Sequence, residues 1–177
     1  MREIVLDTET TGLDPQNGDK IVEIGCVELI NHIPTTNIFH EYVNPAREMP
    51  KEAFKVHGLS TEFLSNKPLF SDVVDNFLIF ISDSPLIIHN SKFDMGFIVA
   101  EMKSLNLATP KNIVIDTLNL ARRKYPGGAA SLDALCRKFN IDNSNREFHG
   151  ALLDANLLAE VYIELLGGRQ QHLGLLA

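Results

Sequence analysis

The sequence predicts an α/β domain in which a mixed five-stranded sheet is flanked by helices. The chain has 177 residues, of which 45% are hydrophobic, and this size and composition suit one domain with a substantial core. Up to residue 43, short apolar runs are separated by turns, which is typical of an antiparallel β meander. From Pro50 onward, helical periods alternate with short apolar runs, which indicates strands joined through helices.

The meander is predicted as three strands. Ile4-Val5-Leu6 is a continuous apolar run that ends in Asp7, and such a run is typical of a central strand that is buried on both faces. The loop after it begins at Thr10, with a turn at Gly18. The three strands are expected at residues 2 to 7, 20 to 30 and 36 to 43.

The later elements are predicted from a period near 3.6 residues. Phe70, Val73, Val74 and Phe77 share one helical face, and Ser60 is a suitable cap for a short helix before them. The expected helices cover residues 50 to 56, 60 to 65, 70 to 82, 92 to 105, 117 to 124, 131 to 139 and 150 to 166, and the two further strands cover residues 85 to 89 and 113 to 115.

The composition argues against several classes of protein. No apolar run approaches the ~20 residues that span a bilayer, and acidic residues at positions 3, 7 and 9 do not fit a secretory signal. We therefore expect a soluble, cytoplasmic protein. Cys26 and Cys136 lie in apolar stretches without metal-ligand spacing, so they are expected to be buried free thiols.

The charge bears on nucleic-acid binding. The net charge is -7, whereas nonspecific affinity for nucleic acid comes mainly from Lys and Arg that neutralise phosphates. Any nucleic acid must therefore be held by metals, by a small groove or by a partner protein. The basic cluster Arg122-Arg123-Lys124 can steer a phosphate backbone, but a solvated helix end is the favoured interpretation.

Asp7 and Glu9 stand two positions apart near the end of the first predicted strand. Alternate residues leave a strand on the same face, so the two carboxylates converge on one point. Such close like charges repel, and a divalent cation relieves the repulsion. The pattern is short, and Glu9 as an ordinary loop carboxylate is the alternative.

Asp94 falls in the first turn of the helix predicted at residues 92 to 105. It shares a face with Phe97, Ile98 and Glu101, so we expect it to point toward the protein interior. An anion near a helix N-terminus is also favourable by itself, by up to about 1 kcal/mol. Taken alone, Asp94 does not require a metal.

His149 and Asp154 form the third polar group. Five residues at ~100° each leave their side chains about 140° apart on a regular helix. A shared site therefore requires His149 to precede the helix, and Gly150 favours that break. Asp154 lines up with Leu157 and Leu158, and no Lys or Arg lies within one helical turn of it. We therefore interpret Asp154 as a metal ligand rather than as part of a salt bridge.

Together these residues predict a site for divalent cations. Oxygen ligands without cysteines suit Mg²⁺ or Mn²⁺ rather than zinc. Two such ions ~4 Å apart hold the attacking and leaving oxygens of a phosphoryl displacement. A neutral histidine beside them can take the proton from the attacking water, a role worth about 10²- to 10⁴-fold. Activity should therefore rise with pH through the pKa of His149.

Several segments also resemble a known enzyme family. Val5-Leu-Asp-Thr-Glu-Thr-Thr-Gly-Leu13, His89-Asn-Ser-Lys-Phe-Asp94 and His149-x-x-x-x-Asp154 resemble, in order, the three motifs of the DEDDh exonucleases of the ribonuclease H-like superfamily. Glu52-Ala-Phe-Lys-Val-His57-Gly, Ile115-Asp-Thr-Leu and Ser131-Leu-Asp-Ala-Leu-Cys resemble the proofreading branch of that family. The resemblance covers residues 2 to about 166 and implies a ribonuclease H-like fold.

The resemblance also implies an activity: removal of nucleotides from DNA 3′ ends in the 3′-to-5′ direction with two divalent cations, Mg²⁺ or Mn²⁺. Asp7 would bridge both cations, Glu9 and Asp154 would complete the shell of one, and Asp94 would hold the other partly through water. His149 would be the general base.

The same resemblance implies a pocket for the 3′-terminal nucleotide. Glu52 and His57 would contact that nucleotide, while Thr8 and the loop from Thr10 to Leu13 would shape its pocket. Asp116 also matches a family position, but a role as N-cap of the next helix is sufficient and we leave it out of the site. The expected substrate-binding residues are Asp7, Thr8, Glu9, Leu13, Glu52, His57 and Asp154.

Three other functions compete with a DNA exonuclease. A DEDDh exoribonuclease or oligoribonuclease would use the same chemistry, because discrimination depends on how the pocket meets the 2′-hydroxyl. An aspartyl-phosphate phosphatase also begins with a strand that ends in an acidic pair, but its downstream Gly-Asp-x-x-x-Asp element is absent. A non-catalytic replication adaptor is disfavoured because all five catalytic positions are filled.

We expect an exonuclease domain at residues 1 to 166 and a flexible tail at residues 167 to 177. Members of the proofreading branch usually continue into a segment that binds the catalytic subunit of the polymerase, and that segment is largely absent before Ala177. In the tail, Gln170, Leu173 and Leu175 resemble the short peptide with which bacterial replication proteins bind the sliding clamp. A terminus with ordinary leucines is the alternative.

Overall fold

The computed structural model describes residues 1–168, and strand β1 (Arg2–Thr10) lies at the centre of its sheet. The strand order is β3-β2-β1-β4-β5. β1 pairs antiparallel with β2 (Ile21–Ile30), which pairs antiparallel with β3 (Ile33–Tyr42). On the other side, β1, β4 (Leu86–Ile88) and β5 (Val114–Asp116) are parallel. The predicted mixed five-stranded sheet is confirmed.

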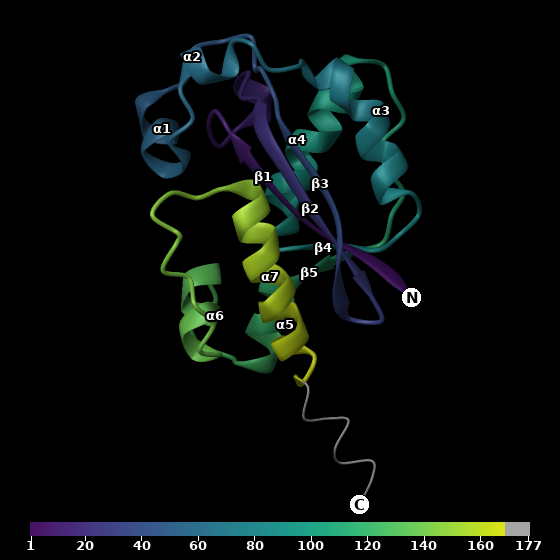
Figure 1. Cartoon of the computed structure of the whole chain (residues 1–177), viewed down its shortest axis with the longest axis vertical. Coiled ribbons are helices and arrows are strands. Elements are labelled where there is room, and N and C mark those ends of the chain that lie inside the picture. Colours follow the sequence, from purple (N-terminus) through teal and green to yellow (C-terminus); the bar gives the residue numbers. More distant parts are fainter. Residues whose placement is uncertain (169–177) are drawn as a thin grey trace, which may run out of the picture.

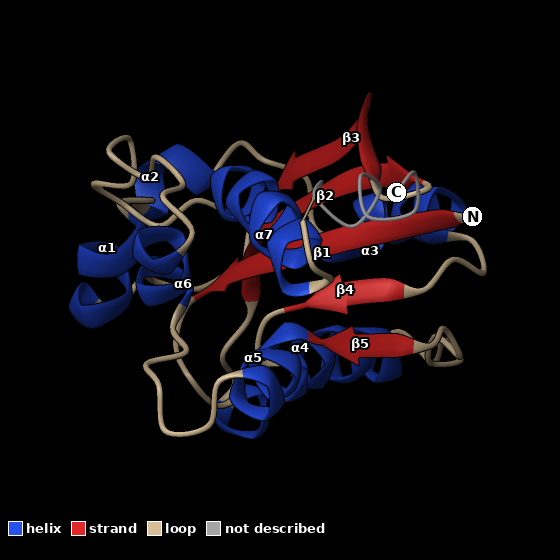
Figure 2. Ribbon diagram, turned by 90° about the horizontal axis from the view of Figure 1, so that it is seen from below, coloured by secondary structure: helices blue, strands red, loops and turns tan. Residues whose placement is uncertain are grey.

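Helices cover both faces of this sheet (Figures 1 and 2). The first two, with a one-turn 3₁₀ helix (Pro15–Asn17) before them, lie near the end of β1 that follows Asp7 (Figure 1). All seven predicted helices are present, within one or two residues of their expected ends. They are α1 (Lys51–His57), α2 (Thr61–Leu64), α3 (Phe70–Ile81), α4 (Ser91–Ser104), α5 (Thr117–Lys124), α6 (Leu132–Lys138) and α7 (Ala151–Leu165).

Each face of the sheet has its own apolar core, because alternate residues of β1 point to opposite sides. Ile4 and Leu6 pack with apolar side chains of α3 and α4. Val5 packs on the other face with apolar side chains of α5, α6 and α7. Cys26 and Cys136 are both free and buried, as predicted. The odd-numbered residues of β1 therefore point toward α7.

One predicted boundary is wrong in a way that matters for the site. β1 was expected to end at Asp7, but it continues to Thr10 because β2 pairs with it along that whole length. Glu9 lies opposite Glu23 in this register, so it is a strand residue and the alternative of a loop carboxylate fails. Asp7 and Glu9 consequently leave the same face of the same strand.

The structure describes only part of the predicted C-terminal region. α7 ends at Leu165, close to the expected end of the domain. The proposed clamp-binding residues Gln170, Leu173 and Leu175 lie outside the described residues. Among residues 1–168, no helix has both the length and the apolar character needed to cross a membrane.

Candidate active site

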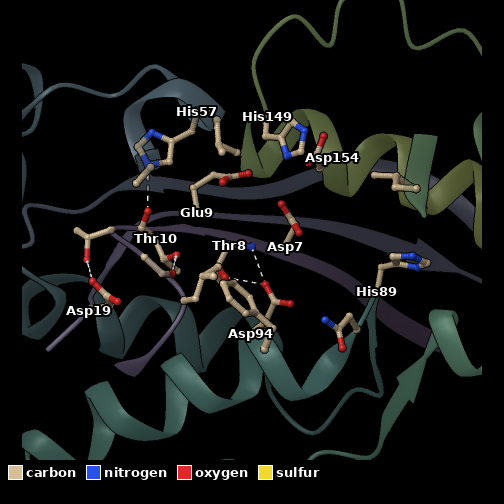
Figure 3. Close-up of a pocket in the computed structure, with 18 of the residues that line it drawn as sticks. Asp7, Thr8, Glu9, Thr10, Asp19, His57, His89, Asp94, His149 and Asp154 are labelled. Carbon is tan, nitrogen blue, oxygen red and sulfur yellow. Dashed lines mark hydrogen bonds between the residues drawn. The ribbon is translucent and has the colours of Figure 1, made fainter. Parts of the chain in front are cut away.

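The four predicted ligands and the predicted base come together at one end of β1 (Figure 3). Asp7 and Glu9 point from the strand toward Asp154 in the first turn of α7, and His149 lies just before that helix. Each of Glu9, His149 and Asp154 offers a ligand atom, and these atoms all lie within 4.8 Å of one another. As the spacing required, α7 starts only after Gly150, so His149 precedes it.

Gly25 allows α7 to begin at this place. It lies opposite Asp7 in the register of β1 and β2. A Cβ atom at Gly25 would come within 2.4 Å of the backbone carbonyl carbon of Ala151, far inside normal contact. The absence of a side chain on β2 therefore lets the first turn of α7 approach the sheet beside Asp7.

Glu23 holds the start of α7 in the same position. Its buried carboxylate accepts a hydrogen bond of 2.9 Å from the backbone nitrogen of Ala151 through Oε1. Its Oε2 lies 2.6 Å from Nε2 of His40. Gly150, the N-cap of α7, offers no side chain, so Glu23 satisfies one of the free N–H groups at this helix end.

Asp94 reaches the site from α4, on the other side of β1. Its Oδ1 accepts hydrogen bonds from the backbone nitrogen of Thr8 at 3.0 Å and from the Thr8 hydroxyl at 2.6 Å. Asp94 is 3% exposed, in agreement with the prediction that it points inward. Thr8 therefore holds the Asp94 carboxylate in place, and the Thr8 hydroxyl is used for this contact.

Asp116 fixes the start of α4 as well as that of α5. Its side chain accepts from the backbone nitrogen of Leu118, which confirms the predicted N-cap of α5. It also accepts from the backbone nitrogens of Asn90 and Ser91, at 3.0 and 3.2 Å. Asn90, the N-cap of α4, has a φ of 64° and makes no side-chain cap of its own. Asp116 is thus a support for the helix that carries Asp94.

Burial, and then nearby negative charge, raises the pKa values of three carboxylates in the site. Burial, followed by the charges of Asp94 and Glu9, raises the pKa of Asp7 well above its usual range. Burial and the charges of Asp154 and Glu23 raise the pKa of Glu9 to about 8. Burial raises the pKa of Asp94 to about 7, although the hydrogen bonds from Thr8 act in the opposite direction. This much buried negative charge requires a cation or protons.

One atom marks the place for a cation. Oδ2 of Asp7 is buried and has no hydrogen-bond partner among the residues that the structure describes. Unpaired buried oxygens are rare in folded proteins, and an ion is one explanation for them. The oxygen-rich donor set around this atom fits the divalent metal ions that the sequence predicts.

Arg146 is the residue that the sequence analysis missed. It forms a two-pronged ion pair with Asp154, from Nε to Oδ1 at 2.7 Å and from Nη2 to Oδ2 at 2.8 Å. The expectation that Asp154 lacks a basic partner is therefore wrong for this structure. Arg146 lies eight positions before Asp154, in the loop between α6 and α7, so a search limited to one helical turn does not find it.

His149 lies in the same loop and is held in place by α1. Its backbone nitrogen donates to the carbonyl of Val56 near the end of α1, at 2.9 Å. Burial, and then the positive charge of Arg146, lowers the pKa of His149. The imidazole is therefore neutral at pH 7, which is the form that a general base needs.

These residues line a cleft of about 820 Å³ that is bounded by β1, α1, α4, α6 and the loop before α7. This volume lies within the usual range for sites that bind small ligands. Leu13 and Glu52, predicted to contact substrate, line it and are largely exposed. Thr8 and His57 line it too and are buried.

His57 has a clear structural role in addition. Its Nε2 lies 3.0 Å from the carbonyl oxygen of Thr10, and its Nδ1 accepts from the backbone nitrogen of Leu59 at 3.1 Å. Both ring nitrogens are therefore occupied by backbone groups, which ties α1 to the end of β1. A contact between His57 and substrate would have to use the face of the ring.

The basic cluster in the last turn of α5 matches the interpretation as a solvated helix end in part. Arg122, Arg123 and Lys124 are exposed, and Nζ of Lys124 donates to the carbonyl of Leu165 at the end of α7. Lys124 thus supports a helix end, while the two arginines face solvent.

Residues 4–162 match the model of the RNase T family, which is described as an exonuclease. The chain is 56% identical over 174 residues to a protein of Rickettsia felis named DNA polymerase III subunit epsilon, covering 96% of this chain and 76% of that protein. The protein of that name from Escherichia coli is 49% identical over 176 residues, covering 95% of this chain and 72% of that protein.

Solved structures agree on the fold. Exonuclease X in complex with 5′-overhanging duplex DNA has a TM-score of 0.74 and 27% identity, covering 93% of this chain and 90% of that one. The nuclease domain of 3′hExo, a DEDDh family member bound to rAMP, has a TM-score of 0.82 at 18% identity, covering 94% and 92% of the two chains. The second likeness shows the fold alone.

Proposed function

The chain belongs to the exonuclease family that its residues 4–162 match, and on that premise we propose that it proofreads DNA 3′ ends for a bacterial DNA polymerase III. The observation that carries the proposal is the convergence of Asp7, Glu9, Asp154 and His149 on the floor of one cleft. Such a group of buried acids beside a neutral histidine suits hydrolysis of a phosphodiester with the help of metal ions.

The family works with divalent metal ions, and we propose two of them here, Mg²⁺ or Mn²⁺. Asp7 would be shared between the two ions, Glu9 and Asp154 would belong to one, and Asp94 to the other. When bound, the ions would neutralise charge on the phosphate and on the attacking and leaving oxygens. The unpaired Oδ2 of Asp7 and the raised pKa values of Glu9 and Asp94 support this assignment.

The remaining steps are assigned to this chain's own groups. His149, neutral at pH 7, would accept the proton of the attacking water. Thr8 holds Asp94 in place through two hydrogen bonds. Leu13 and Glu52 at the exposed side of the cleft, and the ring face of His57, are proposed to position the terminal nucleotide.

The partner is proposed to be the catalytic subunit of DNA polymerase III, as the name of the relatives suggests. A partner that delivers the DNA would also explain how a chain with a net charge of -7 binds it.

The division into an exonuclease domain at residues 1 to 166 and a tail at residues 167 to 177 remains a proposal, as does clamp binding through Gln170, Leu173 and Leu175. A peptide of residues 167 to 177 should bind a bacterial sliding clamp more tightly than the same peptide with Leu173→Ala and Leu175→Ala. Equal binding by the two peptides would refute the clamp proposal.

The function is tested with three 5′-labelled substrates: single-stranded DNA, duplex DNA with a mismatched 3′ end, and single-stranded RNA. With Mg²⁺ or Mn²⁺ the two DNA substrates should shorten from the 3′ end in single-nucleotide steps, and chelation should stop the reaction. Faster degradation of RNA than of DNA would replace the proofreading proposal with an exoribonuclease. No degradation of any substrate by the wild-type chain would refute both.

A further inference from the structure

Arg146 uses all three nitrogens of its guanidinium inside the candidate site. Nε and Nη2 pair with the two oxygens of Asp154, and Nη1 lies 2.7 Å from Oδ2 of Asp133. Nη2 also lies 3.3 Å from Nδ1 of His149. The side chains of Arg146 and Asp154 are 8% and 5% exposed, so the pair between them is shielded from water, whereas the Asp133 side chain is 41% exposed. Arginine is always charged and its fork matches a carboxylate, which makes this a strong buried pair.

The pair disfavours binding of a metal ion to Asp154 at the same time. Both of its oxygens already accept from Arg146. A divalent ion on Asp154 would also lie close to a guanidinium of the same sign, in surroundings that screen charge poorly. Arg146 and a metal ion therefore compete for Asp154.

The contact with His149 has a second consequence. A guanidinium has only donors, so Nδ1 of His149 must be the acceptor in this contact. A neutral imidazole has a single free lone pair, and Arg146 occupies it. With Arg146 in this position, His149 has no lone pair with which to take a proton from water.

We propose that Arg146 is an internal counter-ion that closes the metal-free site, and that it releases Asp154 and His149 together when a divalent ion binds. This inference rests on the metal site proposed above. Asp133, whose side chain is 41% exposed, holds the other edge of the guanidinium and retains Arg146 at the rim of the cleft after release. Binding of the ion and exposure of the base are thereby coupled, and Arg146 acts as a positioning residue that keeps the empty site inactive and stable.

The test is the affinity for Mn²⁺ itself, measured by titration calorimetry without nucleic acid on the whole chain. Arg146→Gln removes the competing charge, so Mn²⁺ should bind at least ~10-fold more tightly, equivalent to ~1.4 kcal/mol. The thermal midpoint of the metal-free Arg146→Gln protein should fall, because Asp154 and Asp133 lose the guanidinium that pairs with them. Arg146→Lys keeps the charge without the two-pronged geometry and should lie between Arg146→Gln and wild type in both measurements.

Arg123→Gln is the matched control, since Arg123 is an exposed arginine on α5, and it should leave Mn²⁺ affinity unchanged. Unchanged or weaker Mn²⁺ binding by both Arg146 variants would overturn the inference, because Arg146 would then not compete for the ligand. If Arg146→Gln does not fold without metal, the Arg146→Lys measurement decides. Failure of wild type and Arg123→Gln to bind Mn²⁺ at all would refute the metal site as well, so the two proposals fail in distinguishable ways.

Discussion

β1 carries buried carboxylates at both ends, facing α7, and the two ends are satisfied in different ways. At the start of the strand, Glu3 is 1% exposed and its Oε2 accepts from the Tyr162 hydroxyl at 2.6 Å. Its Oε1 lies 2.9 Å from Nδ1 of His32. Burial raises the pKa of Tyr162, so its hydroxyl stays protonated and remains a donor.

At the other end, the acids outnumber their partners. Asp7, Glu9 and Asp154 converge with Arg146 as the paired cation, and Oδ2 of Asp7 has no partner among the described residues. In the first arrangement, the hydrogen bond from Tyr162 to Glu3 holds α7 on the sheet. In the second arrangement, buried carboxylates repel one another, and a divalent ion can relieve this repulsion. Burial alone therefore does not identify a functional carboxylate. Oε1 of Glu3 and Oδ2 of Asp7 are both buried without a hydrogen bond among the described residues, but a histidine faces the first, whereas other carboxylates surround the second.

The largest effect on activity should come from removing a single carboxylate at the second end of β1. Asp7→Asn, Asp94→Ala or Asp154→Ala should each remove nearly all exonuclease activity, because one missing ligand unbalances a shared metal site. Glu3→Gln is the control at the first end: it should keep activity but lower the free energy of unfolding by about 1 kcal/mol through a weaker bond to Tyr162. The measurements are cleavage rates with Mg²⁺ and urea unfolding. Wild-type rates for Asp154→Ala would contradict the metal assignment.

Removing the base should cost less than removing a ligand. His149→Ala should lower the rate by about 10²- to 10⁴-fold while Mn²⁺ still binds. Burial and Arg146 lower the pKa of His149, so the rising limb of the wild-type pH profile should lie below pH 6.5 or near it. That limb should be missing in His149→Ala. A mutant profile that keeps the limb would assign it to another group.

The position of α7 can be disturbed without touching any ligand. Gly25→Ala places a methyl group against the backbone of Ala151, and overpacking of this kind costs about 1–3 kcal/mol. Because the first turn of α7 carries Asp154, activity should fall along with stability. Gly128→Ala, whose added carbon would meet only the carbonyl and Cβ of Tyr125 at 3.3 Å and 3.7 Å, is the milder comparison. Full activity in Gly25→Ala would show that α7 tolerates displacement.

The smallest effect concerns the stability of the metal-free protein between pH 6.5 and 8.5. The pKa values of Glu9 and Asp94 are raised on folding, to about 8 and about 7, so the folded state binds more protons than the unfolded state in this range. The stability that these raised pKa values contribute is fully present below the ordinary pKa values of the two carboxyls. It is lost as pH rises through their folded-state pKa values. The free energy of unfolding should therefore decrease toward pH 8.5. Glu9→Gln should flatten the curve, and a stability that instead rises with pH would contradict these shifts.

The sequence by itself determined the elements and their chemical content. Ile4-Val5-Leu6 specified a strand buried on both faces, and the apolar periods specified the seven helices, because these patterns are local and repeat with the period of the backbone. The three motifs also named the residues that gather at the site: two follow the ends of the parallel strands β1 and β4, and the third lies at the start of α7. The length of β1 was underestimated because pairing with β2, not its own apolar run, sets where it ends.

Only the tertiary structure decided which groups satisfy and restrain those residues. Glu23 caps α7 from a distance of 128 positions in the chain, and Gly25 admits the same helix through a register that no local pattern encodes. Arg146 reaches Asp154 because the loop between α6 and α7 folds back over the helix start. The physical reason is that sequence periodicity fixes the direction in which a side chain leaves its own element, whereas charge compensation depends on distances between elements.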